Sequence, residues 1–526
     1  MRRRLAYALF GVLATLVGVA TGHFVASLLN PASSPVLAVG SQVIDLTPVS
    51  LKEYAIRTFG SNDKLVLIGS VMGGVLVLAA VAGLLARRRF ALGAGLQLLL
   101  VAVAAFTAMN RPTAELSDLV PSVATALAGV GSLWLLDRRY TRAAAPAEPA
   151  SSKPSAVVGE DVIDSGPVVR PPSQPSRRGV VLAGGALAVA AAALGGAGRL
   201  IGHYRSRLTD IAFPKPADPA QPFPKGIEGQ YPGITPLRVK TSDFYRVDTR
   251  LDVPIVNIDD WTLTIDGMVD KKLEFSFQDL LDMPLIERDI TLTCVSNSVG
   301  GPYVGGARWI GVRLTDLLEM AGVQDGVDQM FATDVDGMTI GTPYELATDG
   351  RDAMVALGMN GEALPREHGY PARVVIPGLY GFISATKWVT KITMTTYEDK
   401  DSYWTKRDWA TDAPIKISSR IDTPKVLEKL DAGETFIGGV AWAQQNGGVA
   451  KVQVQIDAGG WQDAMLGPSA GNDYWRQWYF PWKAESGSHN LSCRVIDGDG
   501  NIQSDVRSNP FPEGSSGVQQ LIVQVT

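Results

Sequence analysis

Residues 368–388 read HGYPARVVIPGLYGFISATKW. The run Arg373-Val-Val-Ile376, apolar after its arginine, is followed by Pro-Gly, which predicts a buried strand that ends in a tight turn. His368, Arg373 and Lys387 stand around the turns, where the backbone is exposed. An imidazole, a guanidinium and an ammonium placed in this way suit a phosphate and a polar heterocycle. The alternative interpretation is a strand–turn–strand unit whose charges are solvated.

A second candidate lies upstream, where residues 290–301 read ITLTCVSNSVGG. The first residues alternate as a strand, and Cys294 closes it at the start of a polar glycine loop. Such a loop can turn backbone N–H groups toward an anion or oxo group, and a thiolate is a soft ligand for a transition metal. A disulfide with Cys493 or an inert buried thiol are the other interpretations.

The composition limits the class of protein. The chain has 526 residues, two cysteines, four histidines and a net charge of −5. These counts exclude a disulfide scaffold and a zinc site with several cysteines, and they leave little room for a histidine-rich metal centre. The mild acidity gives no reason to expect a nucleic-acid partner.

Five stretches before residue 203 lack Asp, Glu, Lys and Arg and are about long enough to cross a bilayer, namely 5–29, 65–86, 90–109, 119–136 and 180–198. Arginine clusters flank them at residues 2–4, 87–89, 138–142 and 177–178. If the chain crosses five times, all these clusters fall on one side. The positive-inside tendency then predicts a plasma (inner) membrane protein with a cytoplasmic N-terminus and an extracytoplasmic part after residue 203.

Two features of this region suggest more specific roles. Arg177 and Arg178 before the fifth span resemble a twin-arginine export signal, with ordinary positive-inside arginines as the alternative. His23 and His203 would both lie at the outer face. They either hold a b-type haem between them or are isolated interfacial residues.

The polar half of the chain changes character once. Short strands at 261–267, 290–294 and 373–376, with helices at 277–281 and 315–320, predict an α+β domain. After about residue 411 strands are predicted at 435–441, 450–456, 475–480, 488–496 and 519–525. Glycine and aspartate turns separate them, as in an immunoglobulin-type β-sandwich.

The expected organisation has six parts: a membrane domain of four helices at 1–140, a disordered cytoplasmic linker at 141–178, a fifth transmembrane helix at 179–202, an extended tether at 203–240, the α+β domain at 241–410 and an immunoglobulin-like domain at 411–526. The linker contains seven prolines and no aromatic residue.

The segment 368–388 resembles the molybdopterin-binding core of the sulfite oxidase family. Segments 293–301 and 306–318 resemble the family's molybdenum-ligating cysteine region and the stretch that follows it. Segments 439–442, 452–457, 475–478 and 493–497 resemble its immunoglobulin-like dimerisation domain. The resemblance covers about residues 240–526 and implies one molybdenum–molybdopterin cofactor.

The resemblance implies a role for each matching residue. Cys294 would be the thiolate ligand of molybdenum, and His368 and Arg373 would bind the pterin and its phosphate. Further pterin or substrate contacts would come from Phe244, Tyr245, Arg246, Asn297, Thr333, Ala385, Thr386 and Lys387.

Two departures from the family pattern bear on the substrate. Val-Ser-Asn-Ser-Val follows Cys294, where the family's sulfite oxidisers have paired arginines. Trp409 follows Arg407-Asp408, where they place a tyrosine near the metal, and an indole cannot donate a phenolic proton. Arg246 and Trp409 are therefore the residues expected beside the substrate.

Three functions follow from these observations. The first is oxygen-atom transfer to or from sulfur, as in sulfite oxidation, with electrons passing to an external cytochrome or a membrane quinone. The second is reduction of S-oxides or N-oxides, as in the methionine sulfoxide reductases of the same superfamily. The third is a membrane scaffold that has lost its metal. The resemblance also implies a homodimer through the C-terminal domain.

Overall fold

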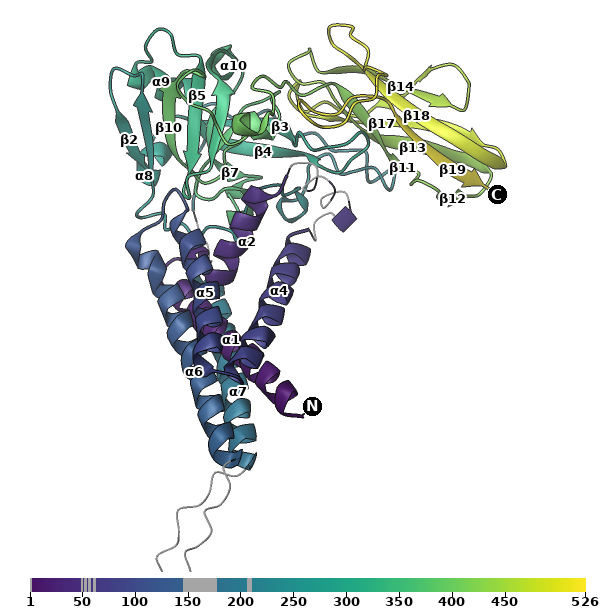
Figure 1. Ribbon diagram of the computed structural model, residues 1–526. Coiled ribbons are helices and arrows are strands. Elements are labelled where there is room, and N and C mark those ends of the chain that lie inside the picture. Colours follow the sequence, from purple (N-terminus) through teal and green to yellow (C-terminus); the bar gives the residue numbers. More distant parts are fainter. Residues whose placement is uncertain are drawn as a thin grey trace, which may run out of the picture. The chain divides into compact units, whose positions relative to one another are not determined.

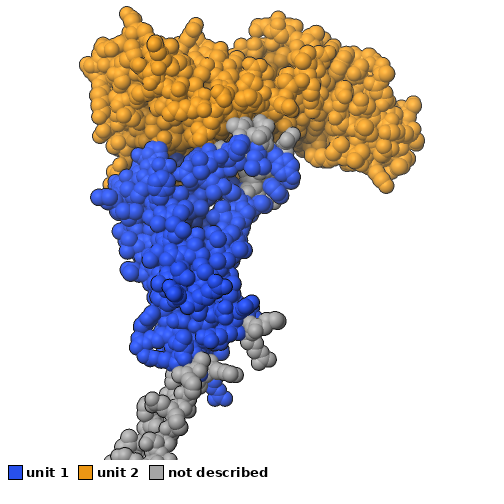
Figure 2. Space-filling view, in the orientation of Figure 1, with its two compact units in different colours: residues 1–207, 250–252 blue, residues 208–249, 253–526 orange. Residues whose placement is uncertain are grey.

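The computed structural model describes residues 2–48, 51, 54, 58–59, 63–144, 177–205 and 211–526. The chain divides into two compact units, residues 1–207 with 250–252 and residues 208–249 with 253–526 (Figure 2). Most of the predicted linker, residues 145–176, lies outside the described residues.

The first unit contains five helices that are long and apolar enough to cross a membrane, in agreement with the predicted spans. They are α1 (Arg2–Leu28), α4 (Asp63–Ala86), α5 (Phe90–Met109), α6 (Val120–Ala144) and α7 (Arg177–Arg205) (Figure 1). A further apolar helix, α2 (Pro35–Leu46), follows α1. Its 12 residues are too few to cross a bilayer, and for that reason it was not among the predicted spans.

Glycines allow these helices to pack closely. A Cβ atom on Gly11 of α1 would lie 2.0 Å from the carbonyl oxygen of Ala79 in α4. A Cβ atom on Gly18 would lie 2.8 Å from the carbonyl oxygen of Thr125 in α6. Small residues at such crossings let the helix backbones approach closely. The resulting van der Waals contacts can hold helices together in lipid, where the hydrophobic effect does not.

The second unit begins with a domain of two sheets and short helices. One sheet has the order β2-β1-β10-β5-β6, and the other has the order β3-β4-β7-β8 with β9 paired to β7. The strands are β1 (Thr262–Gly267), β2 (Leu273–Ser276), β3 (Leu285–Thr293), β4 (Val304–Arg313), β5 (Gln329–Asp334), β6 (Thr339–Pro343), β7 (Met354–Met359), β8 (Glu362–Ala363), β9 (Arg373–Val375) and β10 (Val389–Thr395). The helices are α8 (Phe277–Leu281), α9 (Leu314–Ala321), α10 (Tyr344–Thr348) and α11 (Gly381–Ser384). This mixture confirms the predicted α+β class.

The predicted local elements are present, with one difference in length. Helix α8 is capped by Ser276, whose hydroxyl accepts from the Asp279 N–H, and Gly322 ends α9 with a φ of 69°. Strand β3 starts at residue 285 and not at 290. Three charged residues at 287–289 interrupt the apolar pattern there. Glu287 and Asp289 pair with Arg308 of β4, and Arg288 pairs with Asp352, which precedes β7.

The rest of the second unit is a β-sandwich. Its sheets have the orders β11-β13-β17-β16 and β12-β19-β18-β14-β15. The strands are β11 (Ser418–Thr423), β12 (Lys429–Leu430), β13 (Gly433–Trp442), β14 (Val449–Ile456), β15 (Gln462–Asp463), β16 (Met465–Leu466), β17 (Arg476–Ala484), β18 (Gly487–Asp497) and β19 (Gln519–Val525). All five predicted strands are confirmed; the immunoglobulin-like class stays a prediction.

Both cysteines are free. Cys493 lies in the sandwich core with no exposed surface, and the Ser419 hydroxyl donates to its sulfur at 3.2 Å. The interpretation of a disulfide between Cys294 and Cys493 is therefore wrong.

Residues 211–240, which we call the strap, run in irregular conformation along both parts of the second unit. The Val239 N–H donates to the Gly306 carbonyl of β4, and the Trp475 indole donates to the Leu237 carbonyl at 2.7 Å. The ring of Tyr231 stacks on Tyr479 of β17 at 3.8 Å. This part of the segment expected to be an extended tether thus packs on the domains that follow it.

The sandwich depends on a close strand contact at Gly439 in β13. A Cβ atom there would lie 1.8 Å from the carbonyl oxygen of Arg420 in β11. We expect Gly439→Ala to lower the free energy of unfolding by about 1–3 kcal/mol, because the strands must move apart. Gly460→Ala is the control, since its Cβ atom would meet nothing within 4 Å. Chemical denaturation followed by fluorescence measures both; equal stability of the two variants would contradict the prediction.

Candidate active site

Cys294 stands directly after β3, at the start of the loop that returns to β4. Its N–H donates to the Tyr303 carbonyl, and its sulfur lies 2.9 Å from the Ser296 hydroxyl. Burial raises the pKa of the Cys294 thiol, and Ser296 and the charge of Lys387 offset part of that effect. A coordinated metal cation is therefore the means by which this thiol would become a thiolate at neutral pH.

The three basic residues of segment 368–388 are brought together as predicted. Their interaction is visible in the pKa of His368, which burial lowers to about 4 with further lowering by Arg373 and Lys387. The imidazole is therefore neutral at pH 7, and its Nε2 donates to the Thr241 carbonyl oxygen at 3.2 Å. Burial lowers the pKa of Arg373 to about 10 and that of Lys387 to about 8, so both remain mainly charged.

Arg373 has hydrogen-bonding capacity to spare. Its Nη1 donates to the His368 carbonyl oxygen at 3.1 Å, and its guanidinium lies over the Trp309 ring at 5.1 Å. The buried Nε has no hydrogen-bond partner among the described residues. Burying such a donor without a partner is costly, so the position suits an anionic or polar ligand.

Asp248 forms ion pairs with two further basic side chains, those of Lys387 and Arg246. Its carboxylate accepts from Lys387 Nζ at 2.8 Å and from Arg246 Nε at 2.7 Å. Lys387 Nζ also donates to the Glu367 carbonyl oxygen. Sequence reasoning missed Asp248, because only the fold brings it to a lysine 139 residues away.

The predicted aromatic entry segment lies against this cluster. Phe244 is buried, with its ring edge-to-face with His368 at 5.4 Å and stacked on Tyr245 at 5.1 Å. Burial raises the pKa of Tyr245, and the charge of Cys294 raises it further. Burial also raises the pKa of Tyr380, which the sequence did not single out, and the charge of Cys294 raises it further. Two phenols therefore accompany the thiol.

Trp409 is buried in an aromatic group after the turn at Arg407–Asp408. Its ring lies 5.5 Å from Phe382 of α11 and 5.2 Å from Phe511. The indole Nε1 has no hydrogen-bond partner among the described residues. Because α11 starts beside the Thr293 carbonyl, with a Cβ atom on Gly381 only 3.8 Å from it, this aromatic group adjoins the cysteine segment.

Four of the expected contacts have structural tasks as well. The Asn297 side chain accepts from the Tyr303 N–H at 2.9 Å and so holds the cysteine loop. The backbone carbonyls of Thr386 and Thr333 accept from the Val374 N–H and the Thr390 hydroxyl. Ala385 caps α11. Thr333 lies in β5, and the hydrogen bonds recorded for it belong to its own sheet.

Residues 250–404 match the family model described as the oxidoreductase molybdopterin binding domain. Mitochondrial sulfite oxidase of Homo sapiens is 29% identical over 338 residues, which cover 54% of this chain and 60% of that protein. The chain therefore contains an oxidoreductase molybdopterin binding domain, and sulfite oxidases are among its relatives. Sulfite oxidase of Gallus gallus is 26% identical, over 50% of this chain and 68% of that protein.

A solved structure, the sulfane dehydrogenase SoxCD from Paracoccus pantotrophus, aligns with a TM-score of 0.49 at 25% identity. The alignment covers 55% of this chain and 81% of that chain. Among the curated relatives, the chain spans 60% of the length of the human protein.

The residues present fit the cofactor of this family. Cys294 offers one free, half-buried thiol, and a thiolate suits a soft metal that takes its other ligands from a pterin dithiolene. Arg373 Nε and the buried cations offer the donors that a phosphate and a pterin ring need. His368, neutral and hydrogen-bonded through Nε2, would present Nδ1 as an acceptor.

The buried imidazole makes a specific prediction about acid sensitivity. The pKa of His368 is about 4 in the fold and 6.5 in the unfolded chain. The contribution of neutral His368 to the free energy of unfolding is therefore complete above pH 6.5. It is lost as the pH falls toward 4, by up to about 3 kcal/mol. The cofactor-free His368→Gln variant should show a flatter pH dependence of the free energy of unfolding.

Tryptophan fluorescence during denaturation in detergent measures this effect, because every tryptophan except Trp134 lies in residues 261–482. If the free energy of unfolding of the variant and of the cofactor-free parent protein changed in parallel between pH 4 and 6.5, the buried, neutral state of His368 would be contradicted.

Proposed function

We propose that this chain is a membrane-anchored, molybdenum cofactor-dependent oxidoreductase that transfers an oxygen atom to or from sulfur on the outer side of the membrane. The observation that carries the proposal is a free thiol next to buried basic groups, one of which has an unpartnered donor. A scaffold protein that had lost its cofactor would gain nothing from keeping such a costly arrangement.

The roles of the residues follow from their contacts. When bound, the molybdenum–molybdopterin cofactor supplies the two-electron oxygen-atom transfer chemistry. Cys294 would ligate the metal, and Arg373 and Lys387 would hold the phosphate. Asp248 fixes the position of Lys387 through their 2.8 Å ion pair, and Phe244 with Tyr245 would cover the pterin side.

Trp409 would contact the substrate. The indole N–H is a neutral donor, so it would donate a hydrogen bond to a substrate oxygen without changing its own charge. Its lack of a partner among the described residues is what supports this role. The surrounding rings of Phe382, Trp404 and Phe511 make an apolar wall beside that donor.

Two substrate classes remain in competition. Sulfite is an anion and needs free positive charge, as in the family's sulfite oxidisers. Three arginines that could supply such charge are ion-paired here: Arg246 with Asp248, Arg308 with Asp289, and Arg313 with Asp352. These pairings favour the second candidate class, the S-oxides or N-oxides, because those substrates are neutral overall.

The membrane part would act as an anchor. The arginine clusters support a cytoplasmic N-terminus and an extracytoplasmic enzyme in a plasma (inner) membrane. Electrons would pass to or from an external cytochrome or a quinone, and the sandwich would form a homodimer; these remain predictions, as does the use of the twin-arginine-like motif.

The proposed haem between His23 and His203 also remains a prediction. His23 Nδ1 lies 3.2 Å from the Ser34 hydroxyl, and a Cβ atom on Gly198 of α7 would lie 3.2 Å from the His23 ring. The side chain of His203 is outside the described residues. An optical spectrum of the purified protein without a reducible haem band would contradict the idea.

Replacing the proposed ligand tests the function most directly. Cys294→Ser should abolish molybdenum-dependent turnover, because a hydroxyl is a poor ligand for a soft metal. Metal analysis of the parent protein, expressed with cofactor synthesis, comes first. Less than about a tenth of an equivalent of molybdenum would favour the scaffold, since such sites hold their metal tightly. Turnover unchanged in Cys294→Ser would disprove the assignment of the ligand.

A substrate panel on the molybdenum-loaded protein decides between the two classes. We expect higher kcat/KM for methionine sulfoxide with a reduced dye than for sulfite with an oxidised dye, given the paired arginines. Faster sulfite oxidation would assign the protein to the sulfite oxidisers.

Trp409→Phe keeps an aromatic ring and removes only the N–H. We expect kcat/KM to fall about tenfold, the usual effect of losing one hydrogen bond near the reacting atoms. Trp404→Phe in the same aromatic group is the matched control. Equal kinetics of the two variants would exclude Trp409 as a substrate contact.

A further inference from the structure

The segment that carries Cys294 is held on both sides by the C-terminal sandwich. On the strand side, the Thr291 N–H donates to the Asp473 carbonyl oxygen at 3.0 Å. The Thr291 hydroxyl accepts from the Trp475 N–H at 2.9 Å, and its carbonyl accepts from the Gln444 side chain. All polar groups of this residue, three positions before the cysteine, are therefore committed to the sandwich.

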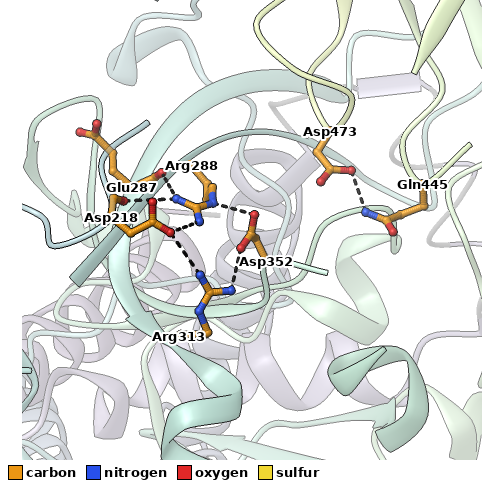
Figure 3. Close-up of polar contacts among 7 residues, drawn as sticks. All are labelled: Asp218, Glu287, Arg288, Arg313, Asp352, Gln445 and Asp473. Atoms are coloured by element: carbon orange, nitrogen blue, oxygen red, sulfur yellow. Dashed lines mark hydrogen bonds and ion pairs between the residues drawn. The ribbon is translucent and has the colours of Figure 1, made fainter. Parts of the chain in front are cut away.

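Asp473 is itself fixed in place. Its carboxylate accepts from the side-chain amide of Gln445, at 2.8 Å (Figure 3). The same view shows Asp218 of the strap and Asp352 paired with Arg288 of β3 and with Arg313. These two arginines and two aspartates tie the strap to the strand that leads to Cys294.

The loop side has two further hydrogen bonds from the sandwich. The Ser515 hydroxyl donates to the Asn297 carbonyl oxygen at 2.6 Å. Arg420 Nη1 donates to the Gly301 carbonyl oxygen at 3.0 Å. Between them, Gly300 has a φ of 76° and lies against Gln519 of β19, so that a Cβ atom would be 2.7 Å from its amide nitrogen.

Arg420 joins three parts of the chain. It is buried in β11, with Nε donating to Asp422 at 2.6 Å and Nη2 donating to the Thr235 hydroxyl of the strap at 2.9 Å. Asp422 in turn accepts from the Thr235 N–H. A buried guanidinium with this set of partners has little freedom, so the Gly301 carbonyl it holds is fixed as well.

The segment around Ser515 also reaches the rest of the site. Phe511 packs on Trp409, and the Ala410 N–H donates to the Pro512 carbonyl. A Cβ atom on Gly514 would lie 2.5 Å from the Tyr380 ring. One loop of the sandwich therefore contacts the cysteine loop, the indole and a phenol near the thiol.

We infer that the C-terminal sandwich positions the thiolate ligand, with Arg420 and Ser515 as positioning residues for the Cys294 loop. The inference rests on the proposed function, in which Cys294 ligates the metal. The sandwich is in this respect part of the active site. Displacing its hold on residues 297–301 changes the direction in which the sulfur meets the metal.

Arg420→Lys and Ser515→Ala test this in the full-length protein, with Arg494→Lys and Ser504→Ala as controls. Arg494 bonds Gln453 on β14, and the Ser504 hydroxyl accepts only from the Val506 N–H among the hydrogen bonds recorded for it. Hydrogen exchange of a peptide covering 291–303 is measured on cofactor-free protein. Each test variant should speed it about tenfold, because one strong hydrogen bond is lost from the loop.

The second measurement is the Mo(V) electron paramagnetic resonance signal of the molybdenum-loaded protein. We expect its g-values to shift in both test variants, to stay at the parent values in both controls, and to return toward them in Ser515→Thr, which restores the hydroxyl. If Arg420→Lys does not fold, the decision rests on Ser515→Ala, which removes a single hydrogen bond.

The outcomes separate the two proposals. Unchanged exchange and an unchanged signal in the test variants, in a parent protein that binds molybdenum, would overturn the positioning role and leave the proposed function intact. A parent protein without molybdenum would overturn the proposed function, and the exchange rates would still show whether Arg420 and Ser515 hold the loop.

Discussion

The second unit buries basic groups whose hydrogen bonds and charges are not all satisfied by the described residues. Arg373 and Lys387 are charged and buried around a neutral His368, and Asp248 is the carboxylate that contacts Lys387. Such an arrangement is costly in an apolar interior unless an anion completes it. The turns of segment 368–388, the entry segment with Phe244 and the Asp248 carboxylate all serve to keep these groups in one place.

The thiol of Cys294 is subject to a related constraint. Burial disfavours the thiolate of Cys294, yet a soft metal requires that form. Rigid support of the loop then matters more than local acidity, since the direction of the sulfur is set by backbone atoms that the sandwich holds.

The two parts of the second unit are connected by many contacts, and the sandwich is not a loosely attached domain. The strap bonds both parts, through Val239 to β4 and through Leu237 to Trp475. Arg420 connects the strap, the sandwich and the cysteine loop within one buried cluster. The first unit, with its five apolar helices, supplies a separate, membrane-compatible body.

Much of this could be read from the sequence. The apolar spans are long and free of charge, so hydropathy determines them, and the strands of the sandwich follow from alternation between glycine turns. Three of the proposed cofactor contacts, His368, Arg373 and Lys387, stand in one segment, whose local motif drew attention to them. Strand β3 was predicted too short, because its charged residues at 287–289 interrupt the apolar alternation that marks a strand. In the fold these charges are paired, Glu287 and Asp289 with Arg308 and Arg288 with Asp352.

Tertiary structure alone decided which groups meet. Asp248 and Lys387 are 139 residues apart, and Ser515 and Asn297 are 218 apart. Hydrogen bonds over such separations leave no periodic trace in a sequence, because they depend on how sheets pack and not on local propensity. The pairing of the candidate substrate arginines and the free state of both cysteines were settled for the same reason.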